Sequence, residues 1–221
     1  MVLNSYIKEP NEQAIACVIW MHGLGADASD MSGLAGQLML SDIPIRHIFL
    51  DAPIRPVTIN NGISMRAWYD IFDLGFTRKE DKEGILISEE QILKAVQTQI
   101  EQGMTSDKIF LAGFSQGGAM ALHTALQMTR PLGGVIALSS YLPLASECKP
   151  SLASNTPMFL GYGAYDTIVL PAWSKLTIDW LSAHSYRNLS WHEYPMEHSI
   201  CMEEVKDLSL WLGELIKRSA A

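Results

Sequence analysis

The sequence predicts an α/β fold with a mostly parallel central sheet and helices on both faces. Two observations support this fold class. Apolar, strand-like runs alternate with helix-like segments along the whole chain, which is the pattern of parallel sheets. The apolar runs are also continuous, as expected of strands that are buried on both faces. Because no repeat, low-complexity tract or linker interrupts the pattern, we expect residues 1–221 to form a single domain.

The first predicted strand covers residues 14–20, an unbroken apolar run. A helix is predicted next, over residues 27–40, where either Asp27 or Ser29 can serve as the N-cap. A second, shorter strand follows over residues 46–50. This order of strand, helix and strand continues along the rest of the chain.

A capping-box pattern predicts the start of the next helix. Residues 88–91 read Ser-Glu-Glu-Gln, which places Ser88 at the N-cap and Gln91 at N3. We therefore expect a helix from Ser88 to about Gln102 that ends at Gly103, because glycine is favoured just beyond a helix C-terminus.

The second half of the chain keeps the alternation of strands and helices. An apolar run over residues 108–112 leads into a tight turn and then a helix-like run over residues 119–126. The alternation continues with two buried apolar strands, a helix that a proline opens, a last strand and a terminal helix with apolar residues at helical spacing. These strands cover residues 134–138, 157–161 and 189–194, and these helices cover residues 171–184 and 199–218.

The tight turn has the pattern Gly-x-Ser-x-Gly at residues 113–117, between a strand and a helix. This is the setting of a nucleophile elbow, in which the serine, here Ser115, stands above the sheet on a strained turn. The backbone N–H of Gln116 would face an oxyanion formed there. The glycine-rich residues 22–27 follow the first strand, and the N–H of Leu24 is the candidate for a second oxyanion donor.

Loops that follow parallel strands meet at one edge of the sheet, where ligands bind. Three of these loops carry Ser115, Asp166 and His198, in the chain order that such sites use. A serine hydroxyl needs a neutral imidazole to take its proton, which fits His198. A carboxylate must hold that imidazole in one tautomer, which fits Asp166. The alternative role for Asp166 is to cap the turn that follows it.

Other residues compete for the roles of acid and base. Asp179 and Asp207 lie within helix-like runs, where a solvated surface carboxylate is expected. His192 lies within a strand and His184 at a helix end, so that both are expected to be structural. His22 precedes the glycine-rich turn, and we expect it to shape the oxyanion loop rather than to act as the base.

Several motifs together resemble one family. On these motifs the chain is similar to the bacterial carboxylesterase and acyl-protein thioesterase family of α/β-hydrolases, also called the phospholipase/carboxylesterase family. One departure is Tyr162-Gly163, where the family commonly has His-Gly. The motifs lie at residues 22–27, 51–58, 66–70, 113–118, 137–143 and 198–199.

The resemblance implies an α/β-hydrolase fold and a serine carboxylesterase that hydrolyses acyl esters through an acyl-enzyme intermediate. The alternative is an acyl-protein thioesterase or a lysophospholipase that uses the same site. The resemblance also implies no cofactor, and members of the family are often homodimers, so that a homodimer is one expectation; no metal ligand is expected. A different class of protein, a catalytically silent binding protein with a hydrolase-like fold, is disfavoured because every element of the site is present.

Residues 71–84 are neither regular nor purely polar. We expect a lid-like loop here, in which Leu74 and Phe76 line an acyl groove and the charged residues 77–83 face water. The alternative is an ordinary surface excursion that its apolar residues anchor.

Composition and charge exclude several classes of function. With a net charge of −8, the chain offers no basic surface for nucleic acid. No apolar run reaches the ~18 residues of an integral membrane segment, and the N-terminus does not read as a signal peptide. Cys17, Cys148 and Cys201 are too few for a disulfide framework and lack metal-site spacing, which favours the cytoplasm.

Overall fold

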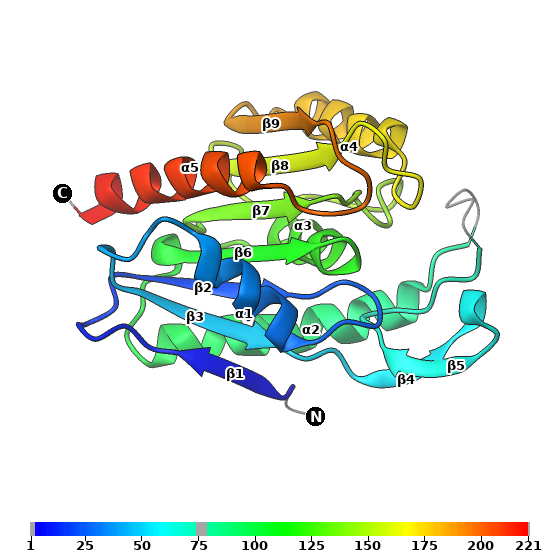
Figure 1. Cartoon of the computed structure of the whole chain (residues 1–221), viewed down its shortest axis with the longest axis horizontal. Helices are drawn as coiled ribbons and strands as arrows, with labels where there is room; N and C mark the ends of the chain where they lie inside the picture. Colours follow the sequence, from blue (N-terminus) through cyan, green and yellow to red (C-terminus); the bar gives the residue numbers. More distant parts are fainter. Residues whose placement is uncertain (1–2, 74–78, 221) are drawn as a thin grey trace.

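The computed structural model describes residues 3–73 and 79–220. Its centre is a seven-stranded sheet in the order β1-β3-β2-β6-β7-β8-β9 (Figure 1). Only β1 runs antiparallel to its neighbour, so that the predicted mostly parallel sheet is confirmed. The strands are β1 (Ser5–Lys8), β2 (Ala16–Met21), β3 (Ile45–Leu50), β6 (Ile109–Phe114), β7 (Gly134–Leu138), β8 (Met158–Gly163) and β9 (Leu189–Tyr194).

Helices cover both faces of the sheet, and each face has its own apolar core. Along β2, Ile19 packs into one core while Val18 and Trp20 pack into the other, because successive side chains of a strand point to opposite faces. No described helix has the length and apolarity that crossing a bilayer requires. Helices α1 (Ala28–Gln37) and α5 (Met202–Ala220) cover one face, and α2 (Lys82–Glu101), α3 (Gln116–Gln127) and α4 (Pro171–Ala183) cover the other.

The predicted start of α2 at Ser88 is wrong. The helix begins at Lys82, and its N-cap is Asp81, whose side chain accepts a hydrogen bond from the N–H of Gly84 at 2.9 Å. Ser88 lies fully buried inside the helix and donates its hydroxyl proton to the carbonyl of Trp68. The predicted lid-like segment is therefore shorter than residues 71–84, because its last residues form the first turn of α2.

The N-cap of α1 is Asp27 rather than Ser29. The Asp27 carboxylate accepts from the N–H of Ser29 at 2.8 Å, and the side chain of Asp30 accepts from the N–H of Asp27 at 3.1 Å. Two helix ends differ from their predicted positions: α1 ends at Gln37 rather than at residue 40, and α5 begins at Met202 rather than at residue 199.

A small antiparallel hairpin was not predicted. It consists of β4 (Ile54–Val57) and β5 (Ile63–Arg66), which pair with each other outside the main sheet. A single 3₁₀ turn, η1 (Thr58–Asn60), connects the two strands. Pro56 lies within β4, and a proline in a short run argues against a strand unless that strand lies at an edge.

Candidate active site

Ser115 stands at the turn from β6 into α3, at the carboxyl end of the sheet. Its backbone has φ 54° and ψ −121°, a sparsely populated conformation for a residue other than glycine. The two flanking glycines make this turn possible. A Cβ on Gly117 would lie 2.1 Å from the carbonyl oxygen of Met21, and one on Gly113 would lie 2.3 Å from the backbone of Gly117. The strand and helix approach too closely here for any side chain.

The structure brings Ser115, His198 and Asp166 together. His198 follows β9, and its Nε2 lies 2.8 Å from the Ser115 Oγ. Asp166 follows β8, and its Oδ2 lies 2.7 Å from the Nδ1 of His198. The hydrogen-bond pattern assigns the Nδ1 proton to the bond with Asp166, so that Nε2 is free to accept the serine proton.

Asp166 holds its position through a second set of bonds. Its side chain is fully buried, and Oδ1 accepts hydrogen bonds from the N–H groups of Ile168 at 2.8 Å and Val169 at 2.9 Å. The capping role and the pairing with His198 therefore coexist on one carboxylate. The imidazole of His198 also packs on Phe114, with 4.9 Å between ring centroids.

The competing acids and bases lie elsewhere. Asp179 is exposed on α4, and His184 stacks on Trp180 at the end of that helix. Asp207 accepts a hydrogen bond from the Tyr194 hydroxyl at 3.0 Å, and its carboxylate lies 3.9 Å from the Nδ1 of His192.

Two backbone N–H groups at this site are available to a ligand. Among the described residues, none accepts a hydrogen bond from the N–H of Leu24 or of Gln116. Gly23 brings the first loop close to the nucleophile, since a Cβ there would lie 3.4 Å from the Cβ of Ser115. The N–H of Gly25 donates to the carbonyl of Arg66 at 2.9 Å and so fixes the far end of the loop.

His22 holds the start of the same loop in a neutral form. Its Nδ1 donates to the carbonyl of Gly23 at 2.7 Å, and its Nε2 accepts from the N–H of Ala52 at 3.0 Å. Burial lowers the pKa of His22 below its usual value, which favours the neutral imidazole that this pair of bonds requires. The carbonyl of His22 in turn accepts from the Trp68 indole at 2.9 Å.

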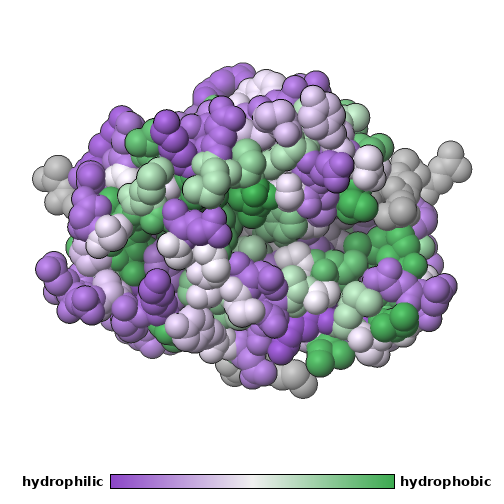
Figure 2. All heavy atoms as spheres, in the orientation of Figure 1, coloured by the Kyte–Doolittle hydropathy of each residue, from purple (hydrophilic) through white to green (hydrophobic). Residues whose placement is uncertain are grey.

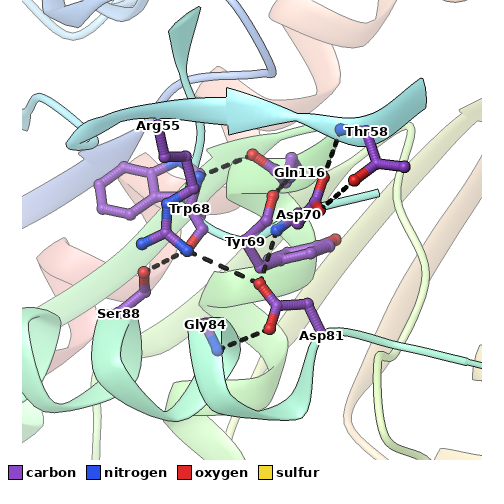
Figure 3. Close-up of polar contacts among 9 residues, drawn as sticks. All are labelled: Arg55, Thr58, Trp68, Tyr69, Asp70, Asp81, Gly84, Ser88 and Gln116. Carbon is purple, nitrogen blue, oxygen red and sulfur yellow. Dashed lines mark hydrogen bonds and ion pairs between the residues drawn. The ribbon is translucent and has the colours of Figure 1, made fainter. Parts of the chain in front are cut away.

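The side chain of Gln116 is a site residue that the sequence reasoning missed. Its Oε1 accepts from the N–H of Trp68 at 2.8 Å, and its Nε2 donates to the carbonyl of Tyr69 at 2.7 Å (Figure 3). A buried amide with both ends bonded to backbone fixes residues 68–69 against the elbow. The motif at residues 66–70 was the available signal, but it did not reveal this partner.

The network continues outward to the hairpin and to α2. The Asp81 carboxylate accepts from the N–H of Asp70 at 2.8 Å and lies 3.7 Å from the Arg55 guanidinium (Figure 3). Asp70 in turn accepts from the N–H of Thr58 at 2.7 Å. Asp81 therefore joins β4, the N-terminus of α2 and residues 68–70 in one polar cluster.

Two hollows lie near the carboxyl end of the sheet. A groove of about 480 Å³ has His198 and Phe114 in its wall. A cavity of about 620 Å³ lies between residues 79–82 and α4, and no residue of the Ser115 cluster lines it. Leu74 and Phe76, the predicted acyl-groove residues, lie outside the described residues. In the described part of the chain, no three His, Cys, Asp or Glu side chains are grouped as a metal site.

Glu204 is a buried carboxyl that lies near the site without belonging to it. It occupies the first turn of α5, and neither of its oxygens has a hydrogen-bond partner among the described residues. Oε1 faces Gly161, where an added Cβ would lie only 1.9 Å away. Burial, reinforced by the nearby Asp207, raises the pKa of Glu204 to about 8. Tyr194 is a further titratable neighbour.

Glu204→Gln is therefore expected to change how stability depends on pH. The folded protein keeps the Glu204 proton up to about pH 8, whereas the unfolded chain loses it near pH ~4.3. Stability is therefore greatest below the unfolded pKa and falls by up to ~1.4 kcal/mol per pH unit towards the folded pKa. Urea unfolding of both proteins at several pH values tests this. The free energy of unfolding of Glu204→Gln relative to wild type should rise across this window, and parallel curves would refute the assignment.

The fold and the site define a class of protein before any comparison is made. A mostly parallel sheet with a serine elbow, and with the acid and base on later loops, is an α/β-hydrolase. The chain matches the phospholipase/carboxylesterase family over residues 3–216 and belongs to that family. It is therefore a hydrolase that acts on carboxylic ester bonds.

Known proteins similar to this chain agree with that assignment. Acyl-protein thioesterase 1 of Neurospora crassa is 35% identical over 218 residues, which cover 93% of this chain and 89% of that protein. The corresponding protein of Yarrowia lipolytica is 33% identical over 91% of this chain and 92% of its own length. The crystal structure of Zea mays acyl-protein thioesterase 2 superposes with a TM-score of 0.85 at 27% identity, covering 96% of this chain and 99% of that one. Both of these curated relatives are fungal, and the expected link to bacterial members in particular is not supported.

Proposed function

We propose that this chain hydrolyses the thioester bond of S-acylated proteins, and carboxylic esters as well, through Ser115, His198 and Asp166. The single observation that carries the proposal is the continuous hydrogen-bond chain from Asp166 through His198 to Ser115. It lies beside the two available N–H groups of Leu24 and Gln116. The names of the curated relatives support a protein thioester as the substrate, and a lysophospholipid is the alternative that the same site would accept.

The proposed reaction has two steps. The Ser115 Oγ attacks the acyl carbonyl carbon while His198 Nε2 takes the hydroxyl proton. The N–H groups of Leu24 and Gln116 stabilise the oxyanion, and each such donor is worth about 3–4 kcal/mol in known cases. His198 returns the proton to the departing sulfur or oxygen, leaving an acyl-enzyme. Water then attacks the acyl-enzyme with His198 as base and releases the acid and the free serine.

A fluorophosphonate probe tests the proposal directly, because only an activated serine reacts with it. We expect the wild-type protein to be labelled and to hydrolyse both a palmitoylated peptide and a matched oxygen ester. Ser115→Ala should show neither activity. An unlabelled wild-type protein would indicate a catalytically silent hydrolase fold instead.

Three further expectations belong to this proposal. A cytoplasmic location is supported by Cys17, Cys148 and Cys201, which are all free thiols. The homodimer that the resemblance implies can be tested by sedimentation of the purified protein. The single domain over residues 1–221 predicts one cooperative unfolding transition.

The lid-like segment is proposed to select the acyl chain. Burying one more methylene against Leu74 and Phe76 is worth about 0.8 kcal/mol, or roughly fourfold in kcat/KM per carbon. The double change Leu74→Ser and Phe76→Ser should therefore flatten the dependence of kcat/KM on chain length while sparing acetyl esters. One substrate series measured on both proteins decides this, and equal slopes would mean that the segment is a plain surface loop.

A further inference from the structure

A groove runs beside the catalytic base on the α1 face of the molecule. One wall is α1, with Ser29, Gly33 and Gln37, and the other is the chain after β9, with Ile200. His198 itself forms part of the wall. In Figure 1 this is the near face, where α1 and α5 lie in front of the sheet. In the same view, Figure 2 shows apolar residues between these two helices with hydrophilic residues around them.

The proposed reaction determines what part of the substrate lies there. His198 Nε2 must give its proton to the departing atom, so that this atom has to lie beside His198. Whatever the departing atom carries then extends into the space that borders His198. The groove borders His198, whereas the larger cavity by α4 has neither Ser115 nor His198 in its lining.

We propose that this groove binds the leaving group of the substrate, namely the peptide segment that carries the acylated cysteine. The inference rests on the proposed function and names the substrate class of the same site. Leu34 and Ile200 offer apolar contact to side chains, and the Gln37 amide can bond to peptide groups. The Ser29 hydroxyl donates to the Asp27 carboxylate at 2.5 Å, so that it can only accept a bond from the peptide.

The charges of the groove favour a neutral or basic peptide over a phosphate-bearing leaving group. Asp30 contributes a carboxylate, and no Lys or Arg is among the described residues that line the groove. The N-terminus of α1 offers no anion site either. The N–H of Ala28 donates to the Asp51 side chain at 2.9 Å, and that of Ser29 donates to the Asp27 side chain. A phosphodiester, as in a lysophospholipid, would therefore meet the Asp30 carboxylate without a compensating positive charge among the described lining residues.

Helix α1 supplies a matched pair of positions for the test. Gly33 and Gly36 are both exposed, and a Cβ at either would have no atom within 4 Å. Only Gly33 lines the groove. Tryptophan at Gly33 should therefore fill the groove, whereas tryptophan at Gly36 makes the same substitution in the same helix outside it.

The experiment compares two butyryl thioesters, one of N-acetylcysteamine and one of a lysine-containing cysteine hexapeptide. The measured quantity is kcat/KM, which includes the step in which the leaving group departs, whereas both substrates form the same acyl-enzyme. We expect wild type and Gly36→Trp to prefer the peptide roughly tenfold, and Gly33→Trp to lose that preference. Gly36→Trp should hydrolyse the small thioester as wild type does, and Gly33→Trp should lose more of its kcat/KM on the peptide than on the small thioester. Gln37→Trp serves as a second groove variant if Gly33→Trp fails to label with a fluorophosphonate.

Each outcome decides between the proposals. If a Gly33→Trp or Gln37→Trp protein that labels with the fluorophosphonate keeps the preference for the peptide, the groove is not the leaving-group site. A lysophospholipid turned over more efficiently than the peptide would overturn its assignment to peptide, and so would a preference for glutamate in place of lysine. If wild type hydrolyses neither thioester, the proposed function fails, and the groove assignment fails with it.

Discussion

Ser115→Ala is expected to lower kcat on an activated aryl ester by several orders of magnitude, approaching the ~10⁶ seen when known triads lose their serine. The hydroxyl that lies 2.8 Å from His198 Nε2 is the only atom of the residue that can form the acyl-enzyme. The change removes one oxygen and leaves the turn between β6 and α3 in place. Initial rates with a purified protein of verified fold are the measurement.

Ser139→Ala is the matched control for that variant. Ser139 also follows a buried strand, β7, and also has a positive φ, 45°. Its hydroxyl faces the carbonyl of Ser199 at 3.5 Å rather than an imidazole. We expect Ser139→Ala to keep most of its activity. Near-wild-type turnover by Ser115→Ala would exclude Ser115 as the nucleophile.

Asp166→Asn is expected to lower kcat by roughly 10⁴ while the protein stays folded. The asparagine oxygen can keep the two bonds from the N–H groups of Ile168 and Val169. Its NH₂ group then faces His198 Nδ1 and donates to it. The imidazole proton moves to Nε2, which can no longer accept from Ser115. The loss is thus one of tautomer rather than of structure, and thermal unfolding should show little change.

Asp179→Asn and Asp207→Asn are the comparisons for this change. Asp179 is exposed, and Asp207 bonds to the Tyr194 hydroxyl rather than to the imidazole of His198. Rates on one activated ester, measured for all three variants, identify the acid. A severe loss in Asp179→Asn or Asp207→Asn, with Asp166→Asn active, would mean that the acid is misassigned.

The parallel core could be predicted because its strands are continuous apolar runs. In residues 16–20, successive side chains pack alternately into the two cores, which matches a strand that is buried on both faces. The placement of Ser115, Asp166 and His198 on loops at one edge then followed from the parallel order alone.

The edges of the structure could not be predicted in the same way. All four residues of β1 are exposed, and its two apolar residues, Tyr6 and Ile7, are too few to form a continuous apolar run, so that only its pairing with β3 identifies it as a strand. The hairpin of β4 and β5 forms a separate two-stranded sheet, and its strands are mostly exposed or half-buried, so that no buried apolar run marks them in the sequence. Ser88 matches a capping box in sequence, but its hydroxyl donates to the carbonyl of Trp68, and Asp81 is the N-cap of α2.

Because Gln116 uses both its backbone and its side chain at the site, substitutions on the hairpin and at the start of α2 are expected to change catalysis. Its N–H is a proposed oxyanion donor, while its side chain bonds to the backbone of residues 68–69. The N–H of the next residue, Asp70, donates to Asp81, which pairs with Arg55 on the hairpin. We expect Asp81→Ala to lower kcat with little effect on KM, although Asp81 touches neither nucleophile nor base. Steady-state rates measure this, and an unchanged kcat would show that Asp81 does not affect catalysis through Gln116. The hairpin of β4 and β5 and the turn at Ser115 would therefore vary together among relatives. Replacing the hairpin with that of a relative would require replacing Asp81, its partner at the start of α2, as well.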